Sequence, residues 1–241
     1  LPDHRDYMLT LPPMVGELPS KADLRGNDSP IFDQGQLGSC TANAIAGAYM
    51  HNLKKQNETM FTPSRLFIYY NERKMEGTVK SDSGAMIRDG IKSINTDGVC
   101  TESCWPYDIS KFTKKPTRSC YKEARNHQTL AYSRVPRDLN TMKSCIASGL
   151  PFVFGFAVYE SFMTRAVAQT GMMIMPNKDE SVMGGHAVMA IGYDDSIEGG
   201  RFIVRNSWGE RWGDKGYFYM PYEYLTNKGL SDDFWVIQTV E

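Results

Sequence analysis

The spacing of apolar residues changes near residue 130, and this change limits the folds that the chain can adopt. Before that point, apolar residues recur at three- and four-residue steps, as they do along one face of a helix. After it, short apolar runs alternate with glycine-rich turns, which is typical of strands. Helices followed by strands predict an α+β protein with two lobes, a helical one before about residue 130 and one rich in strands after it. Residues 1–17 form an extension, and we expect a ligand site in the cleft between the lobes.

The expected helices have distinct start signals. One begins at Cys40 and has apolar residues at every third or fourth position. A second opens at Thr62-Pro63, where a capping hydroxyl is followed by proline in the first turn. A third covers residues 85–94 and ends before Asp97-Gly98. The expected strands are residues 152–158, 186–193, 201–205, 217–220 and 234–240.

Composition and charge exclude several classes of partner. Hydrophobic residues make up 41% of the chain and charged residues 23%, which is ordinary for a soluble globular protein. The formal net charge of -1 gives no reason to expect nucleic acid or an anionic membrane as a partner. No apolar run approaches the length that crosses a bilayer. The chain begins Leu-Pro-Asp without a signal-peptide pattern, so we expect either processing or a start inside a longer precursor.

The chain has five cysteines, at positions 40, 100, 104, 120 and 145. If one of them is a reacting thiol, the other four can form two disulfides in three connectivities. Disulfides suit a secreted or lumenal protein (extracellular, periplasmic, vacuolar or lysosomal), whereas five reduced thiols would suit a cytosolic one. Among the three connectivities we predict Cys104 with Cys120 and Cys100 with Cys145. Zinc is not expected, because Cys100 and Cys104 lack a second close pair.

A glycine-rich turn over residues 34–39 places Cys40 in the first turn of its helix. The positive end of the helix dipole favours a thiolate, which is the nucleophilic form of cysteine. The Cys40 N–H is available to stabilise an oxyanion, and the Gln34 amide can supply a second donor. A lone cysteine of this kind is more often a small buried hydrophobe. Two later segments favour the catalytic interpretation.

The first of these segments places His186 at the mouth of an apolar strand. The second is the run from Asn206 through Trp208, in which a carboxamide can orient an imidazole while the indole shields their contact from water. Alone, a histidine at a strand end would more often have a structural role. Together the segments predict Cys40 as nucleophile, His186 as its base and Asn206 as the residue that holds the histidine.

Three ordered motifs resemble those of the papain family of cysteine peptidases, which includes the cathepsins. They are Gln-Gly-x-x-Gly-Ser-Cys at 34–40, Gly-His-Ala at 185–187 and Asn-Ser-Trp-Gly-x-x-Trp-Gly-x-x-Gly-Tyr at 206–217. A cysteine followed by histidine and asparagine roughly 130–150 residues downstream is the arrangement of this family. The resemblance runs from about residue 18 to the C-terminus, and it implies a helical lobe over residues 18–130 and a β-barrel-like lobe over residues 131–241. It implies that Gln34 lines the oxyanion hole, Cys40 attacks, His186 shuttles the proton and Asn206 fixes His186.

The chain also departs from the family pattern. Leu37 stands where most members have a cysteine, Thr41 replaces the usual aromatic residue, and Ser-Asp-Ser-Gly at 81–84 replaces Cys-Asn-Gly-Gly. Gly185 replaces the acidic residue or asparagine often found before the histidine. The usual disulfides therefore cannot be carried over. None of these changes removes a catalytic group, and together they favour bacterial or viral relatives over animal and plant ones.

The resemblance further implies a set of substrate-binding residues. Gly84 would pair with the substrate backbone, and Trp208 and Trp212 would border the leaving-group side. The pocket for the second residue before the scissile bond would be lined by small or flexible residues, so an apolar side chain is expected there. These residues are Ala85, Met86, Gly155 and Ala187, and Gly185 is expected to bind substrate as well.

The predicted activity is hydrolysis of polypeptides through a covalent acyl-enzyme, with no metal or organic cofactor. Cys40 and His186 are expected to rest as thiolate and imidazolium, and the protein is expected to act as a monomer. His4, His51 and His127 are isolated rather than paired as in exopeptidase relatives, which favours an endopeptidase. The alternatives are a catalytically silent binding protein of the same fold and another Cys-His acyl transferase, such as a transglutaminase or a peptidoglycan amidase.

The proline-rich residues 1–17 are predicted to pack across the body and partly cover the cleft or its rim. Apolar side chains for such docking come from Tyr7, Met8, Leu9 and Leu11. The extension would then be a partner of the site in an inactive precursor, and a protein inhibitor is a further expected partner. A disordered leader is the alternative.

Overall fold

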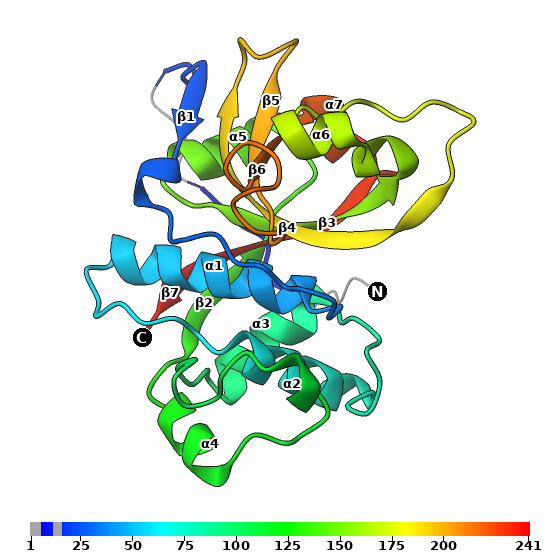
Figure 1. The fold of residues 1–241 in the computed structure, drawn as a ribbon. Coiled ribbons are helices and arrows are strands. Elements are labelled where there is room, and N and C mark those ends of the chain that lie inside the picture. Colours follow the sequence, from blue (N-terminus) through cyan, green and yellow to red (C-terminus); the bar gives the residue numbers. More distant parts are fainter. Residues whose placement is uncertain (1–5, 12–15) are drawn as a thin grey trace.

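The computed structural model describes residues 6–11 and 16–241. Its helices are α1 (Cys40–Lys55), α2 (Arg65–Glu76), α3 (Ile87–Thr96), α4 (Arg118–Ala124), α5 (Leu139–Ala147), α6 (Arg165–Thr170) and α7 (Tyr222–Thr226). Its strands are β1 (Lys21–Asp23), β2 (Thr129–Arg134), β3 (Phe152–Tyr159), β4 (Val182–Asp194), β5 (Arg201–Arg205), β6 (Tyr217–Pro221) and β7 (Ser231–Val240). Figure 1 shows α1 to α4 on one side of the molecule and β3 to β6 with α5 to α7 on the other. The predicted α+β fold with two lobes is confirmed.

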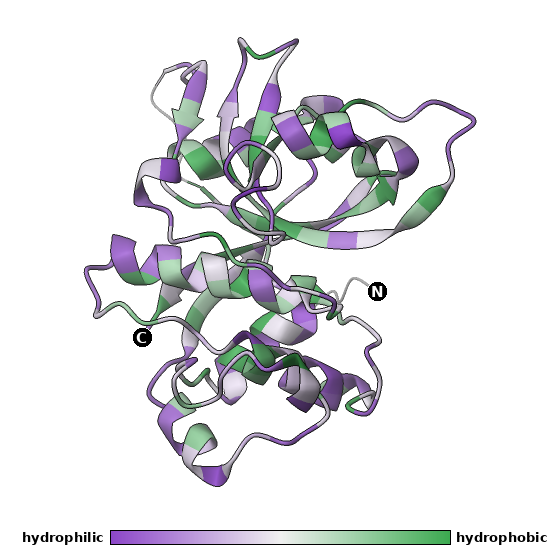
Figure 2. Cartoon of the chain, viewed as in Figure 1, coloured by the Kyte–Doolittle hydropathy of each residue, from purple (hydrophilic) through white to green (hydrophobic). Residues whose placement is uncertain are grey.

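Each lobe has its own hydrophobic core. One core gathers the apolar faces of α1, α2 and α3, and the other gathers the residues between the sheet and α5 to α7. Hydrophobic residues are accordingly concentrated on the central strands and inner helices of both lobes in Figure 2. Strand β7 belongs to both cores, because successive side chains of a strand point to opposite faces. Trp235 and Ile237 enter the first core, whereas Phe234 and Val236 enter the second.

The strands of the described residues form one antiparallel sheet in the order β2-β7-β3-β4-β5-β6, with β1 paired to β4. Strand β3 lies between β4 and β7, so these three strands run side by side below the cleft. Strand β1 precedes residue 130 but pairs with a strand of the second lobe. A short segment near the beginning of the chain therefore belongs to the sheet of the second lobe.

Two predicted helix starts were wrong by a few residues. Helix α2 begins after Ser64, whose Oγ accepts a hydrogen bond from the Phe67 N–H at 3.1 Å, rather than at Thr62-Pro63. The helix begins after the serine because the serine hydroxyl accepts a hydrogen bond from the third amide of the helix. Helix α3 begins at Ile87 instead of residue 85, while α1 begins at Cys40 as predicted. Within the described residues, no helix is both long enough and apolar enough to span a membrane.

All five cysteines are free thiols, and they lie in three separate places: Cys40 at the start of α1, Cys100, Cys104 and Cys120 together, and Cys145 apart from both. The Sγ atoms of Cys104 and Cys120 are 2.7 Å apart, and Cys100 Sγ lies within 4.8 Å of both. Cys145 lies in the other core, where its thiol contacts the Leu150 carbonyl. The predicted pairing of Cys100 with Cys145 is therefore wrong, because the two residues belong to different cores. The pairing of Cys104 with Cys120 stays a prediction.

The described part of the N-terminal extension packs against the end of β2. The Leu9 N–H donates to the Arg134 carbonyl and the Arg134 N–H donates to the Tyr7 carbonyl, both at 2.8 Å. The Asp6 carboxylate contacts Arg88 at 3.0 Å and Arg134 at 3.4 Å. Leu9 is buried, whereas Tyr7 is 81% exposed and does not dock as predicted. The part of this prediction that concerns residues 1–5 and 12–15 lies outside the described residues.

Candidate active site

Cys40 stands at the first position of α1, where the helix amides have no carbonyl partner within the helix. The backbone amides of Ala187, Thr41 and Cys40 itself act to lower the pKa of its thiol. The preceding turn is held by the Asp82 carboxylate, which accepts from the Gly38 N–H at 3.0 Å and from the Tyr69 hydroxyl at 2.5 Å. The nucleophile thus sits on a loop whose backbone is fixed before any substrate binds.

Gln34 is buried beside this turn, with its amide fixed at both ends. Its Oε1 accepts from the Ser207 hydroxyl at 2.7 Å, and its Nε2 donates to the Leu37 carbonyl at 3.1 Å. The Gln34 N–H also donates to the Ser207 carbonyl at 2.8 Å, which links the two lobes. The second Nε2–H has no acceptor among the described residues, so it is available to an oxyanion.

His186 lies on β4 and its ring nitrogen Nε2 is 2.7 Å from Asn206 Oδ1. Both residues are buried, at 7% and 1% exposure. The Trp208 ring stacks on the imidazole with centroids 4.9 Å apart, and Phe156 meets the imidazole edge to face at 5.7 Å. These rings exclude water from the histidine-asparagine contact, which is the arrangement predicted for Asn206 and Trp208.

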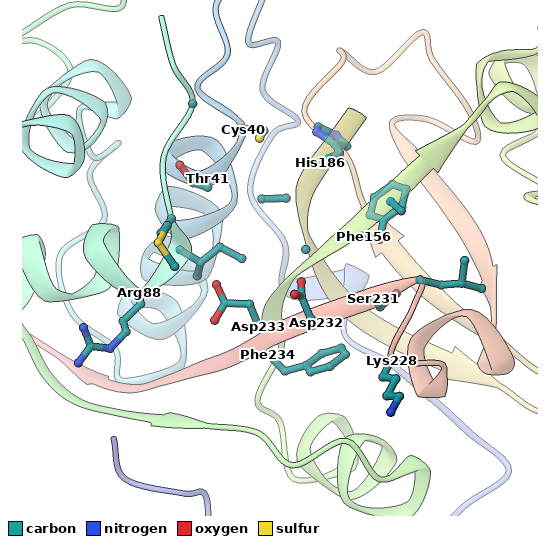
Figure 3. A pocket seen from close by; sticks show the side chains of 18 of the residues that line it. Cys40, Thr41, Arg88, Phe156, His186, Lys228, Ser231, Asp232, Asp233 and Phe234 are labelled. Carbon is teal, nitrogen blue, oxygen red and sulfur yellow. The ribbon is translucent and has the colours of Figure 1, made fainter. Parts of the chain in front are cut away.

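The hydrogen bond to Asn206 also determines which nitrogen of His186 carries the proton. Asn206 Oδ1 can only accept, so His186 Nε2 carries the proton of this bond and Nδ1 is the nitrogen left for the thiol. Figure 3 shows His186 and Cys40 facing one another from β4 and α1 at the same end of one pocket. The two side chains come from different lobes, as the order of the motifs required.

Burial shifts the pKa values of both Cys40 and His186. It raises the pKa of the Cys40 thiol, an effect that the nearby Glu72 reinforces and the three amides oppose. It lowers the pKa of His186 to about 4, against the hydrogen bond to Asn206. Both directions favour thiol and neutral imidazole, contrary to the expected thiolate and imidazolium. The attraction between the two charges works in the other direction, so the charged pair stays a prediction.

The pocket between the lobes has a volume of about 1070 Å³. Six of the predicted substrate-binding residues line it together with Cys40 and His186: Gly84, Ala85, Met86, Gly155, Gly185 and Ala187. Trp208 and Trp212 do not line it. Trp212 packs edge to face on Trp208 with centroids 5.1 Å apart, so the two indoles lie behind the histidine.

Several lining residues were not predicted from the sequence. Thr41 lines the pocket next to the nucleophile, and Phe156 lies under the histidine. Asp232 and Asp233 reach the same pocket from β7. The adjacent acidic pair at the beginning of an apolar strand was a signal that sequence reasoning passed over. Its relevance depends on strand order, because β7 is far from Cys40 in the sequence but separated from β4 only by β3.

Known proteins are similar to this chain in sequence or in fold. A family model described as papain family cysteine protease matches residues 18–234. An uncharacterized peptidase C1-like protein of Acanthamoeba polyphaga mimivirus is 49% identical over 218 residues, covering 87% of this chain and 70% of that protein. Mouse cathepsin K is 27% identical over 228 residues, covering 90% of this chain and 65% of that protein.

A solved structure of a cysteine protease also has this fold. Xylellain, a cysteine protease from Xylella fastidiosa, is 46% identical and superposes with a TM-score of 0.92, covering 100% of this chain and 94% of that chain. The expectation of bacterial and viral relatives is confirmed by xylellain and the mimivirus protein. The chain belongs to the papain family of cysteine proteases, and its activity is that of a cysteine peptidase.

Proposed function

We propose that the protein is an endopeptidase in which Cys40, His186, Asn206 and Gln34 carry the reaction. The observation that carries this proposal is the His186–Asn206 hydrogen bond of 2.7 Å, because it leaves Nδ1 facing the thiol on α1. A histidine held in this tautomer can take the proton from sulfur and later deliver it. Nucleophile, base and orienting residue are thus assembled without a metal or an organic cofactor in the sequence of steps.

The reaction follows from these positions. The Cys40 sulfur attacks the substrate carbonyl carbon, and its proton passes to His186 Nδ1. The developing oxyanion accepts hydrogen bonds from the Cys40 N–H, which lies in the first turn of α1, and from the second Nε2–H of Gln34, which has no acceptor among the described residues. Collapse of the tetrahedral intermediate breaks the C–N bond, and His186 gives its proton to the leaving amine. Water, deprotonated by His186, then releases the acid and restores the Cys40 thiol.

The positions of the remaining histidines support cleavage inside a chain rather than at its ends. His51 contacts the Gly149 carbonyl at the back of α1, and His127 packs on Phe61 with centroids 4.2 Å apart. Neither residue lines the pocket, so neither can bind a substrate terminus there. His4 lies outside the described residues.

A peptide blocked at both ends, with a fluorophore and a quencher on either side of its internal bonds, tests this proposal. Cleavage by the wild type, with the Cys40→Ala variant inactive and Cys40 labelled by an epoxide inhibitor, is the expected result. No cleavage together with no labelling would favour the catalytically silent protein. Cleavage only of peptides with free ends would favour an exopeptidase, and amide products formed only with an added amine would favour an acyl transferase.

We also propose a secreted or lumenal location and a role for the N-terminal extension as a partner of the site. The closeness of Cys104 and Cys120 supports an oxidising compartment. The contacts of Asp6 and Leu9 with the β2 end, and Met8 at the pocket, support the extension as a partner. Monomeric action stays part of the proposal.

A further inference from the structure

One carboxylate of the pocket faces the substrate side of the sheet because of strand register. Gly155 on β3 pairs with Ala187 on β4 and, on its other edge, with Asp232 on β7. Directly paired residues of antiparallel strands point to the same face, so the three residues form a row that starts beside His186. Gly155 has no side chain, and a Cβ placed there would lie 3.4 Å from Asp232 Oδ1. The missing side chain therefore opens the pocket toward this carboxylate.

A β-bulge chooses which of the two aspartates takes this place. Val153 pairs with Trp235, but Gly155 pairs with Asp232, so β7 contains one residue more than β3 between the two pairs. Asp233 has a φ of 60°, a left-handed conformation that suits the extra residue of a bulge. Its carboxylate accepts from the Trp235 indole N–H at 2.7 Å and lies 3.8 Å from Arg134. Asp233 is thereby used within the fold, and Asp232 is left facing the pocket.

The basic residues around the pocket do not neutralise Asp232. Arg88 and Arg134 pair with Asp6, at 3.0 and 3.4 Å. Arg137 donates to the backbone carbonyls of Leu225 and Ser231. Figure 3 shows Lys228 directed away from Cys40 and His186, whereas Asp232 is directed into the pocket.

The Asp232 side chain is exposed to the pocket, and no described residue donates a hydrogen bond to its carboxylate or forms an ion pair with it. An apolar substrate side chain in this place would remove water from the carboxylate without replacing its hydrogen bonds, which is unfavourable. A long cationic side chain satisfies both parts of the pocket. Its methylene groups can lie along Ala157 and Ala85, and its charged end can reach Asp232.

We propose that Asp232 selects a basic residue, arginine before lysine, as the second residue before the scissile bond. Arginine is preferred because its planar guanidinium can give two parallel hydrogen bonds to one carboxylate. The proposal rests on the proposed endopeptidase function and replaces the sequence-based expectation of an apolar residue at this position. Asp232 acts in specificity and takes no part in the bond-breaking steps.

The test uses peptide substrates that differ only at this position, which carries arginine, its neutral analogue citrulline, or leucine. For the wild type, kcat/KM should be about 10-fold higher with arginine than with citrulline, as expected for a charge-assisted hydrogen bond. Asp232→Asn should lose this preference and raise kcat/KM for leucine, because a neutral amide loses less than a carboxylate when an apolar side chain removes its water. The control Asp97→Asn, which removes a carboxylate at the end of α3 away from the pocket, should keep the wild-type preference.

The charge-reversed variant Asp232→Lys supplies a second measurement, since it should disfavour arginine and favour glutamate at the same position. Titration of active sites with an epoxide inhibitor corrects each rate for the folded fraction. Equal kcat/KM for arginine and citrulline in the wild type, or an unchanged arginine preference in Asp232→Asn, would overturn the assignment. Cleavage of the leucine peptide in those cases would leave the endopeptidase function intact, whereas a wild type inactive on every peptide would overturn both.

Discussion

His186 Nε2 lies 2.7 Å from Asn206 Oδ1, and the same oxygen accepts the Ser207 N–H at 2.8 Å. The carboxamide oxygen is therefore held by the backbone of its own loop before it meets the imidazole. Ser207 in turn donates its hydroxyl to Gln34 Oε1. One short chain of hydrogen bonds thus connects the base on β4 to the oxyanion donor beside α1, so that the two lobes set the catalytic geometry together.

The first prediction distinguishes the two residues that take part in bond changes, Cys40 and His186, from Asn206, which orients the histidine. Cys40→Ala and His186→Ala should abolish peptide hydrolysis, because each removes an atom that forms or breaks a bond. Asn206→Ala should leave weak activity, about 10²-fold below the wild type, since the imidazole stays in place but loses the contact that fixes its tautomer. Steady-state kcat and KM on one blocked peptide measure this ranking, and wild-type turnover by Cys40→Ala would refute the mechanism.

The second prediction concerns the oxyanion. Gln34→Ala removes a donor that acts mainly on the transition state, so kcat should fall about 10²- to 10³-fold, or about 3 kcal/mol, while KM changes little. Ser207→Ala is the matched variant, because it keeps the Gln34 amide but frees its oxygen. It should have a smaller effect on kcat. A large rise in KM with unchanged kcat in Gln34→Ala would assign the residue to ground-state binding instead.

The third prediction is a bell-shaped dependence of kcat/KM on pH. As pH falls through about 4, His186 takes up a proton and can no longer accept the one from Cys40, so activity is lost on the acidic side. Because burial raises the pKa of the Cys40 thiol, the second proton should leave the pair only at alkaline pH, above the usual thiol range. These limbs belong to the coupled pair rather than to single residues. An acidic limb near neutral pH would contradict the prediction.

The same titration distinguishes thiol from thiolate at neutral pH. Ultraviolet absorbance of the thiolate, taken as the difference between the wild type and Cys40→Ser, reports the charge on sulfur directly. Absence of this signal on the plateau of activity is expected if burial dominates. A full thiolate signal would show that the attraction to a protonated His186 outweighs the cost of burial.

The sequence predicted the catalytic residues because their chemistry is tied to local motifs. The turn before Cys40 and the run after Asn206 each contain their structural reason within a few residues. The strands from 152 onward were predicted for a similar reason, since their alternation is local. By contrast, strand β2 was missed: four of its six residues are exposed or partly exposed, and its place is set by pairing with β7.

Asp232 shows more clearly which features of the site cannot be predicted from the sequence. Its position depends on a bulge in β7, on the register with Gly155 and on the absence of a side chain there. None of these is visible in the run Ser231 to Phe234 itself. The expectation of an apolar pocket came from Ala85, Met86 and the small residues of β3 and β4, and it left out the residues that β7 contributes.

The fourth prediction concerns the N-terminal extension. Deleting residues 1–17 removes Asp6 from Arg88 and Arg134 and removes Met8 from the pocket. We expect kcat/KM to rise several-fold on a long peptide, because an intramolecular segment occupies its site at high effective concentration. Asp6→Asn is the control with the full chain, and it should give a smaller rise. Identical kinetics with and without the segment would favour a disordered leader.

The last prediction concerns the thiols of the helical lobe. With glutathione disulfide as oxidant, Cys104 and Cys120 should lose two protons and two electrons and form a bond, because their Sγ atoms are 2.7 Å apart. Burial raises the pKa of Cys100 and raises that of Cys104 to about 12, so little thiolate is present at neutral pH and the reaction should be slow. The bond would close a loop of about 16 residues and stabilise the fold by about 3 kcal/mol.

Mapping of unreduced peptides should find Cys104 joined to Cys120, with Cys100 and Cys145 still alkylated. Cys145→Ser should leave the bond and the gain in unfolding free energy unchanged, whereas Cys104→Ser should remove both. A bond between Cys100 and Cys120, or zinc retained by the three thiols in place of any bond, would refute this pairing, since the three sulfurs lie within 4.8 Å of one another.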